Sequence, residues 1–124
     1  MDLKVLPDQD VPAYRQIADQ IKSQILRGTL PPGEALPPIR LVSRELGISV
    51  ITVRSAWEIL ESEGLIETRA GSGCYVAELP AETLCARRKA EFSEKLRRLI
   101  AEAKSYGLSQ AEIEELVGSV RDKR

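Results

Sequence analysis

The stretch LPPIRLVSRELGISVITVRSAWEILESEGLIETRAGSGCYV (residues 36–76) decides the fold of this chain. Its apolar spacing predicts one helix over residues 38–46 and a second over residues 50–63. Gly47 stands where a left-handed residue ends a helix, and Ser49 is a good N-cap for the helix that follows. The two helices are therefore expected to meet at a tight turn.

A hairpin is predicted directly after the second helix. Residues 65–68 and 74–78 have the composition of two short strands, and Gly71-Ser72-Gly73 joins them. Helix, tight turn, helix and two-stranded wing follow one another in the order of a winged helix-turn-helix. Such a domain can offer its second helix to a major groove and its hairpin to the neighbouring groove or backbone.

Further helices are predicted on both sides of this stretch. Residues 12–28 carry one apolar stripe at spacings of three and four, and a turn rich in proline and glycine follows. Beyond Pro80, residues 81–105 form one long helical pattern that Tyr106-Gly107 ends. Ser109 with Glu112 has the capping-box spacing for a last, shorter helix.

The expected fold is mostly α with a small β-hairpin. A winged helix-turn-helix domain over residues 1–79 is followed by a short two-helix tail over residues 80–124. Two helices of this size have little core of their own, so their apolar faces need the winged domain or a second chain. We favour a second chain and predict a homodimer through residues 81–124.

Composition narrows the function. The formal charge is −1, and residues 1–80 hold 8 lysines and arginines against 11 acidic residues, so a nucleic-acid surface must depend on where a few cations point. Histidine is absent and Cys74 and Cys85 are isolated, so we expect no enzyme, no metal site and no cofactor. No membrane span or secretory signal is present in the sequence, and a cytoplasmic location is expected.

The start of the helix at 50–63 is the first candidate for binding. Counted at ~100° per residue from the buried side, Ile51 faces away from the core and Thr52 and Arg54 lie on the flanks. Free N–H groups of the first turn suit a phosphate, and the Ser49 and Thr52 hydroxyls can add donors. Arg54 can neutralise a phosphate or fork onto a guanine. Ile51, or Val50 if the phase differs by one, would contact a thymine methyl.

Arg40, near the start of the preceding helix, and Arg69, before the hairpin turn, are further candidates for phosphate or base contacts. Gly71 and Gly73 permit positive φ and a close approach of the backbone to a groove. The alternatives stay open: each arginine can be a solvated surface charge, each glycine can serve hairpin geometry, and Ile51 can belong to the core. Acidic residues later in the second helix restrict its groove contact to the N-terminal half: Glu58, Glu61 and Glu63.

Several motifs together resemble the GntR family of bacterial transcription regulators, over about residues 10–78. They are PAYRQI (12–17), ILRGTLPPGEALP (25–37), IR (39–40), LGISVITVRSAWEILESEGLI (46–66) and GSGCYV (71–76). Only 44 residues follow Pro80, which is similar to the YtrA subfamily. That resemblance implies a short two-helix tail that dimerises, and a repressor associated with transporter genes.

The resemblance also implies roles for single residues. Arg40 falls at an arginine that contacts DNA, and Gly71 falls at a wing tip that enters the minor groove. The positions of the recognition-helix contacts are filled by Ser49, Val50, Ile51, Thr52 and Arg54. Three departures from the family's pattern weaken the electrostatic contribution to DNA binding that the resemblance implies. Pro38-Ile39 replaces a common Ser-Glu, so that Pro38 must provide a preset first turn, Val50 replaces a common arginine, and Ser72 replaces a basic wing residue.

We therefore expect a sequence-specific, DNA-binding transcription regulator, a dimeric repressor on double-stranded, inverted-repeat operator DNA. A winged-helix module that binds a protein partner is the alternative. A small-molecule effector stays open, because no residue signature identifies one.

Overall fold

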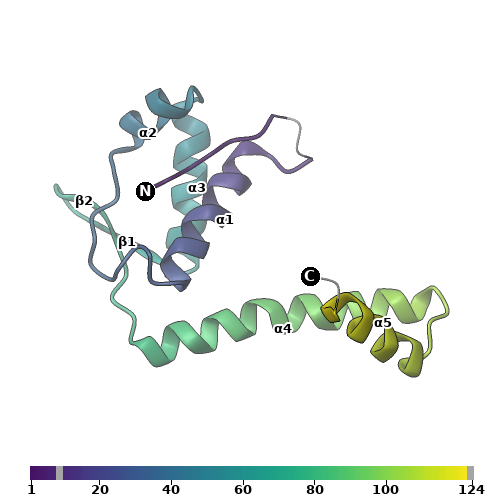
Figure 1. The fold of residues 1–124 in the computed structure, drawn as a ribbon. Coiled ribbons are helices and arrows are strands. Elements are labelled where there is room, and N and C mark those ends of the chain that lie inside the picture. Colours follow the sequence, from purple (N-terminus) through teal and green to yellow (C-terminus); the bar gives the residue numbers. More distant parts are fainter. Residues whose placement is uncertain (8–9, 123–124) are drawn as a thin grey trace. The chain divides into compact units, whose positions relative to one another are not determined.

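The computed structural model describes residues 1–7 and 10–122. Seven elements follow in the order expected, mostly helices with one hairpin (Figure 1). The chain separates into two compact units, Met1–Leu84 and Cys85–Arg124. The elements are α1 (Ala13–Leu26), α2 (Ile39–Leu46), α3 (Val50–Ser62), β1 (Ile66–Arg69), β2 (Gly73–Val76), α4 (Ala81–Ser105) and α5 (Gln110–Asp122).

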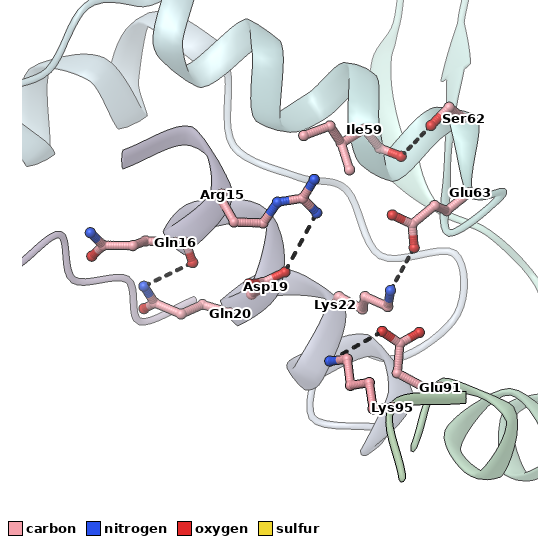
Figure 2. A network of polar contacts seen from close by, with 10 residues as sticks. All are labelled: Arg15, Gln16, Asp19, Gln20, Lys22, Ile59, Ser62, Glu63, Glu91 and Lys95. Carbon is pink, nitrogen blue, oxygen red and sulfur yellow. Dashed lines mark hydrogen bonds and ion pairs between the residues drawn. The ribbon is translucent and has the colours of Figure 1, made fainter. Parts of the chain in front are cut away.

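The core of the first unit lies between α1 and α3. Side chains three and four residues apart on each helix point inward and are almost fully buried, as the apolar spacing predicts. An ion pair closes one end of this interface, because the Lys22 ammonium on α1 lies 2.6 Å from the Glu63 carboxylate after α3 (Figure 2). The central core residues are Ile17, Ile21, Ile25, Val53, Trp57 and Leu60.

The turn between α2 and α3 is made as predicted. Gly47 ends α2 with a φ of 67°. The Ser49 hydroxyl accepts a hydrogen bond from the N–H of Thr52 and so caps α3. The expectation for Pro38 was wrong, since it is the N-cap of α2 and not part of its first turn. Its carbonyl accepts bonds from the N–H groups of Leu41 and Val42, which starts the helix without a side-chain cap.

The hairpin of β1 and β2 is antiparallel, with Ile66 opposite Val76 and Arg69 opposite Gly73. A third segment pairs with β2, which the sequence did not indicate because it is rich in proline and glycine. The Leu36 N–H donates to the Cys74 carbonyl at 2.9 Å, and residues 33–36 run along this edge. The loop after α1 therefore becomes part of the wing's support.

An N-terminal arm lies along α1 and is held by side-chain amides. Gln16 and Gln20 each bond the N–H and the carbonyl of one arm residue, Leu6 and Lys4 respectively. Four residues of helix rise about 6 Å, close to two residues of extended chain, so successive turns of α1 meet alternate arm residues. The arm is thereby docked through its backbone.

The second unit carries most of the long helix α4 and the shorter α5. Ser109 and Glu112 form the predicted capping box, with N–H to side-chain distances of 2.9 and 3.2 Å. Ile113 is buried within the single chain. Leu108 is partly buried, and Tyr106 is exposed in the turn between the helices. The helices of this unit also carry exposed large apolar side chains: Phe92, Leu96, Leu99, Ile100, Leu116, Val117 and Val120.

Candidate nucleic-acid interface

The N-terminal half of α3 has one buried and one open side. Val53 is fully buried, whereas Ile51, two residues earlier, is 72% exposed. Two residues turn the helix by about 200°, which is why these neighbours face opposite ways. Ile51 is thus not a core residue, and the alternative of a core position is excluded. An isoleucine held in water at a helix start is available for contact with another molecule.

The first turn of α3 has fewer free donors than expected. The Thr52 N–H is used by the Ser49 cap at 3.1 Å, and the two hydroxyls also bond each other at 2.8 Å. In the described part of the chain, the N–H groups of Val50 and Ile51 have no recorded partner. An anion at this helix end would therefore meet two backbone donors and the two hydroxyls beside them.

Two of the predicted arginines, Arg40 and Arg54, are exposed, and no partner for either lies among residues 1–7 and 10–122. A third such cation, which was not predicted from the sequence, is Arg44, in the same helix as Arg40. Arg40 and Arg44 are four residues apart and lie on the side of α2 opposite the buried Val42. That spacing was the signal that could have found Arg44.

The wing arginine differs from these. The Arg69 guanidinium lies 3.1 Å from the Glu67 carboxylate and 4.1 Å from the centre of the Tyr75 ring. Gly71 and Gly73 flank the turn with φ of 72° and 113°, so the positive φ predicted for them is confirmed. An added Cβ would meet no atom within 4 Å at either glycine, which leaves the backbone of the tip open to a neighbour.

The acidic end of α3 is tied to the wing. The Thr68 hydroxyl on β1 donates to the Glu61 carboxylate at 2.6 Å, while Glu58 is exposed on the open side of the helix. The carboxylates of Glu58 and Glu61 would repel the phosphates of DNA. Cations and free donors therefore gather at α2 and the first turns of α3, and negative charge gathers at the far end.

Neither a metal site nor a membrane span is found in the part of the chain that the structure describes. No cluster of three or more histidine, cysteine or acidic residues could hold a metal ion there. None of the described helices is long and apolar enough to cross a membrane.

Comparison with known proteins gives the family. Residues 13–76 match the model for bacterial regulatory proteins of the gntR family. The chain is 31% identical over 118 residues to the HTH-type transcriptional repressor YtrA of Bacillus subtilis, a match that covers 95% of this chain and 91% of that protein. Other relatives are longer, and the chain spans only 16% of the probable rhizopine catabolism regulatory protein MocR of Rhizobium meliloti.

Solved structures agree with this assignment. The GntR-family factor YtrA of Sulfolobus acidocaldarius matches with a TM-score of 0.65 and 32% identity, over 83% of this chain and 97% of that one. The DNA-binding domain of AraR, solved in complex with an operator, matches with a TM-score of 0.55 and 30% identity, over 62% and 99%. The chain therefore belongs to the gntR family of bacterial regulatory proteins and is a DNA-binding transcription regulator of the YtrA type.

Proposed function

We propose that the protein is a dimeric repressor that binds an inverted-repeat operator through α2, α3 and the wing. The observation that carries the proposal is the open N-terminal half of α3, where Ile51 is exposed beside two unused backbone donors. YtrA of Bacillus subtilis, which aligns over nearly the whole chain, is named a repressor. The site of action would be the chromosome, in the cytoplasm.

The contacts divide into two kinds. Ser49, Thr52, Arg40 and the newly found Arg44 would hold phosphates and fix the register of α3, without reading sequence. Arg54 and Ile51 would face base edges. Arg54 can fork onto a guanine, and Ile51 would lie against a thymine methyl, which gains apolar burial from an otherwise exposed side chain.

The wing would approach the neighbouring minor groove. Gly71 and Gly73 leave the tip without side chains on either side of Ser72, so the backbone can come close to the sugar–phosphate wall. At position 72 a serine hydroxyl stands where a basic residue is common in the family. At position 50 a valine side chain stands where an arginine is common. Few phosphate contacts imply a shallow dependence of affinity on salt and a larger share for DNA shape.

Residues 81–124 would form the dimer. The two helices of the second unit carry seven exposed large apolar side chains: Phe92, Leu96, Leu99, Ile100, Leu116, Val117 and Val120. Burying this set against the same set of a second copy removes apolar surface from water on both chains. A two-fold axis through such an interface would place the two winged domains on an inverted repeat.

The family resemblance suggests genes for a transporter as the regulated target.

The test of the whole proposal is selection of bound duplexes from a random DNA library with the purified protein. We expect an inverted repeat, with thymines near the position of Ile51. A selection that yields no consensus, even at low salt, would instead point to a protein partner for the winged domain. Recovery of a single half-site would contradict the proposed dimer but not the proposed binding of DNA.

A matched pair of variants separates specific DNA binding from a general charge effect. Replacing Arg40 and Arg54 together by alanine is expected to abolish retention on DNA and to weaken retention on heparin. Replacing two exposed arginines of the tail, Arg97 and Arg98, by alanine changes the net charge equally and should leave DNA retention close to that of the parent. Equal losses in the two double variants would refute the assignment of α2 and α3.

A further inference from the structure

One face of the wing hairpin carries a three-residue cluster that the DNA-contact scheme does not use. Glu67 lies opposite Tyr75, and Arg69 lies two residues along the same strand. Side chains alternate across a strand, so these three share one face, while Ile66 and Val76 point to the core. The cluster thus sits on the outer surface of the hairpin, next to its tip.

The guanidinium of Arg69 is engaged on two sides. Its Nη2 donates to Glu67 Oε1 at 3.1 Å, and its carbon lies 4.1 Å from the centre of the Tyr75 ring, which is within the range of a cation–π contact. Tyr75 is itself fixed, because its hydroxyl bonds the Ser72 hydroxyl and donates to the Ser72 carbonyl at 3.2 Å. Arg69 therefore rests on a restrained ring with a carboxylate beside it.

The two contacts have different consequences for binding an anion. The ring restrains the guanidinium without adding formal charge. The carboxylate cancels the charge of the arginine locally and would repel a phosphate brought to the same place. Arg69 and Glu67 are both about half exposed, so a phosphate can reach the pair. Arg40 and Arg54 have no such carboxylate, within the residues that the structure describes.

We propose that Glu67 competes with DNA for Arg69, so that the wing arginine adds little to affinity until this carboxylate is displaced or removed. Glu67 is then a positioning residue that limits the wing's electrostatic contribution and leaves discrimination to α3. The inference rests on the proposed contact between the wing and DNA, and its tests separate the two.

The experiment replaces Glu67 by glutamine, which keeps a neutral acceptor of nearly the same shape. The probe is a labelled pool of duplexes of random sequence, because contacts to phosphates contribute to affinity independently of the base sequence. Binding is measured by fluorescence anisotropy at several salt concentrations, for the full chain. Thermal unfolding of each variant reports that the fold is retained.

We expect E67Q to bind more tightly and to steepen the slope of log affinity against log salt by about 0.9 per wing, the value for one added phosphate contact. The advantage of the variant over the parent should then shrink by about 3.5-fold per wing between 50 and 200 mM salt, as that slope dictates. Arg69→Gln should have little effect in the parent and should remove the gain in the E67Q background.

The control is Asp19→Asn on α1, which makes the same charge change beside an arginine, Arg15, that is assigned no contact with DNA. An E67Q slope equal to the parent's, or an equal gain in the presence and absence of Arg69, would overturn the competition. If Arg54→Gln weakens binding while every wing variant matches the parent, DNA binding by α3 stands and the wing assignment fails with this inference. If the parent binds no duplex, the proposed function and the inference both fail.

Discussion

Replacing Ile51 by serine tests the assignment of α3 most directly. Ile51 is 72% exposed, so the change removes almost no core packing, and the free energy of unfolding should stay within about 0.5 kcal/mol of the parent. Full burial of an isoleucine side chain is worth about 1.5–3 kcal/mol, and a thymine methyl would cover only part of it. A loss near 1 kcal/mol per half-site follows, which is roughly a fivefold rise in Kd for each half-site contacted.

The assay is anisotropy on the duplex recovered from the library, with thymine or uracil at the position that faces Ile51. Uracil lacks only the methyl group, so it removes the proposed contact from the DNA side. The parent should bind the uracil duplex about fivefold more weakly, by the same estimate. Ile51→Ser should bind both duplexes alike, and Ile51→Val should keep most of the preference.

Two results would contradict a contact between Ile51 and a thymine methyl. One is an affinity and base preference for Ile51→Ser that match those of the parent. The other is a thymine preference that persists in full in the serine variant, because the methyl would then be read by another residue. Unfolding of the serine variant at a much lower temperature would contradict the exposed position itself.

Three further outcomes are expected. Combining Arg40→Gln with Arg44→Gln should reduce the slope of log affinity against log salt by about 1.8 per half-site, since each would hold one phosphate, and an unchanged slope would exclude phosphate contacts for both. Leu96→Glu should weaken self-association roughly 100-fold, since an unpaired charge would be buried at the dimer interface, while far-UV circular dichroism stays the same; sedimentation velocity measures this, and an undisturbed dimer would place the interface elsewhere. The pKa of Glu112 lies below its ordinary value because the Ser109 N–H and hydroxyl bond its carboxylate, so the cap stabilises α5 above the unfolded pKa and is lost as the pH falls through the lower folded pKa. In an NMR titration Ser109→Ala should raise the pKa of Glu112 part of the way, and no change would mean that the hydroxyl plays no part.

Local signals explain why much of this fold could be predicted. The glycine at 47, the cap at Ser49 and the capping box of Ser109 and Glu112 each act within four residues, and each was found as predicted. The helical period placed Val53 inside and Ile51 outside for the same reason. These features depend on backbone geometry that neighbouring residues fix, and distant parts of the chain do not alter them.

Pairings between distant segments could not be predicted in the same way. The strand-like edge at residues 33–36 arises because β2 offers free backbone groups, and its own composition indicates only a turn. The docking of the arm on Gln16 and Gln20 joins residues 10 to 16 positions apart. Loop closure makes such contacts dependent on the whole fold.

The helices, their caps, the hairpin and the outward face of α3 could be read from the sequence, because they follow from periodicity and local hydrogen bonding. Which cations are available to DNA follows from the folded structure alone. Arg40, Arg44 and Arg69 are equivalent in the sequence, but the strand register brings Glu67 and Tyr75 to Arg69 alone. A charge is defined by its residue, whereas its freedom to bind DNA depends on the neighbours that folding places around it.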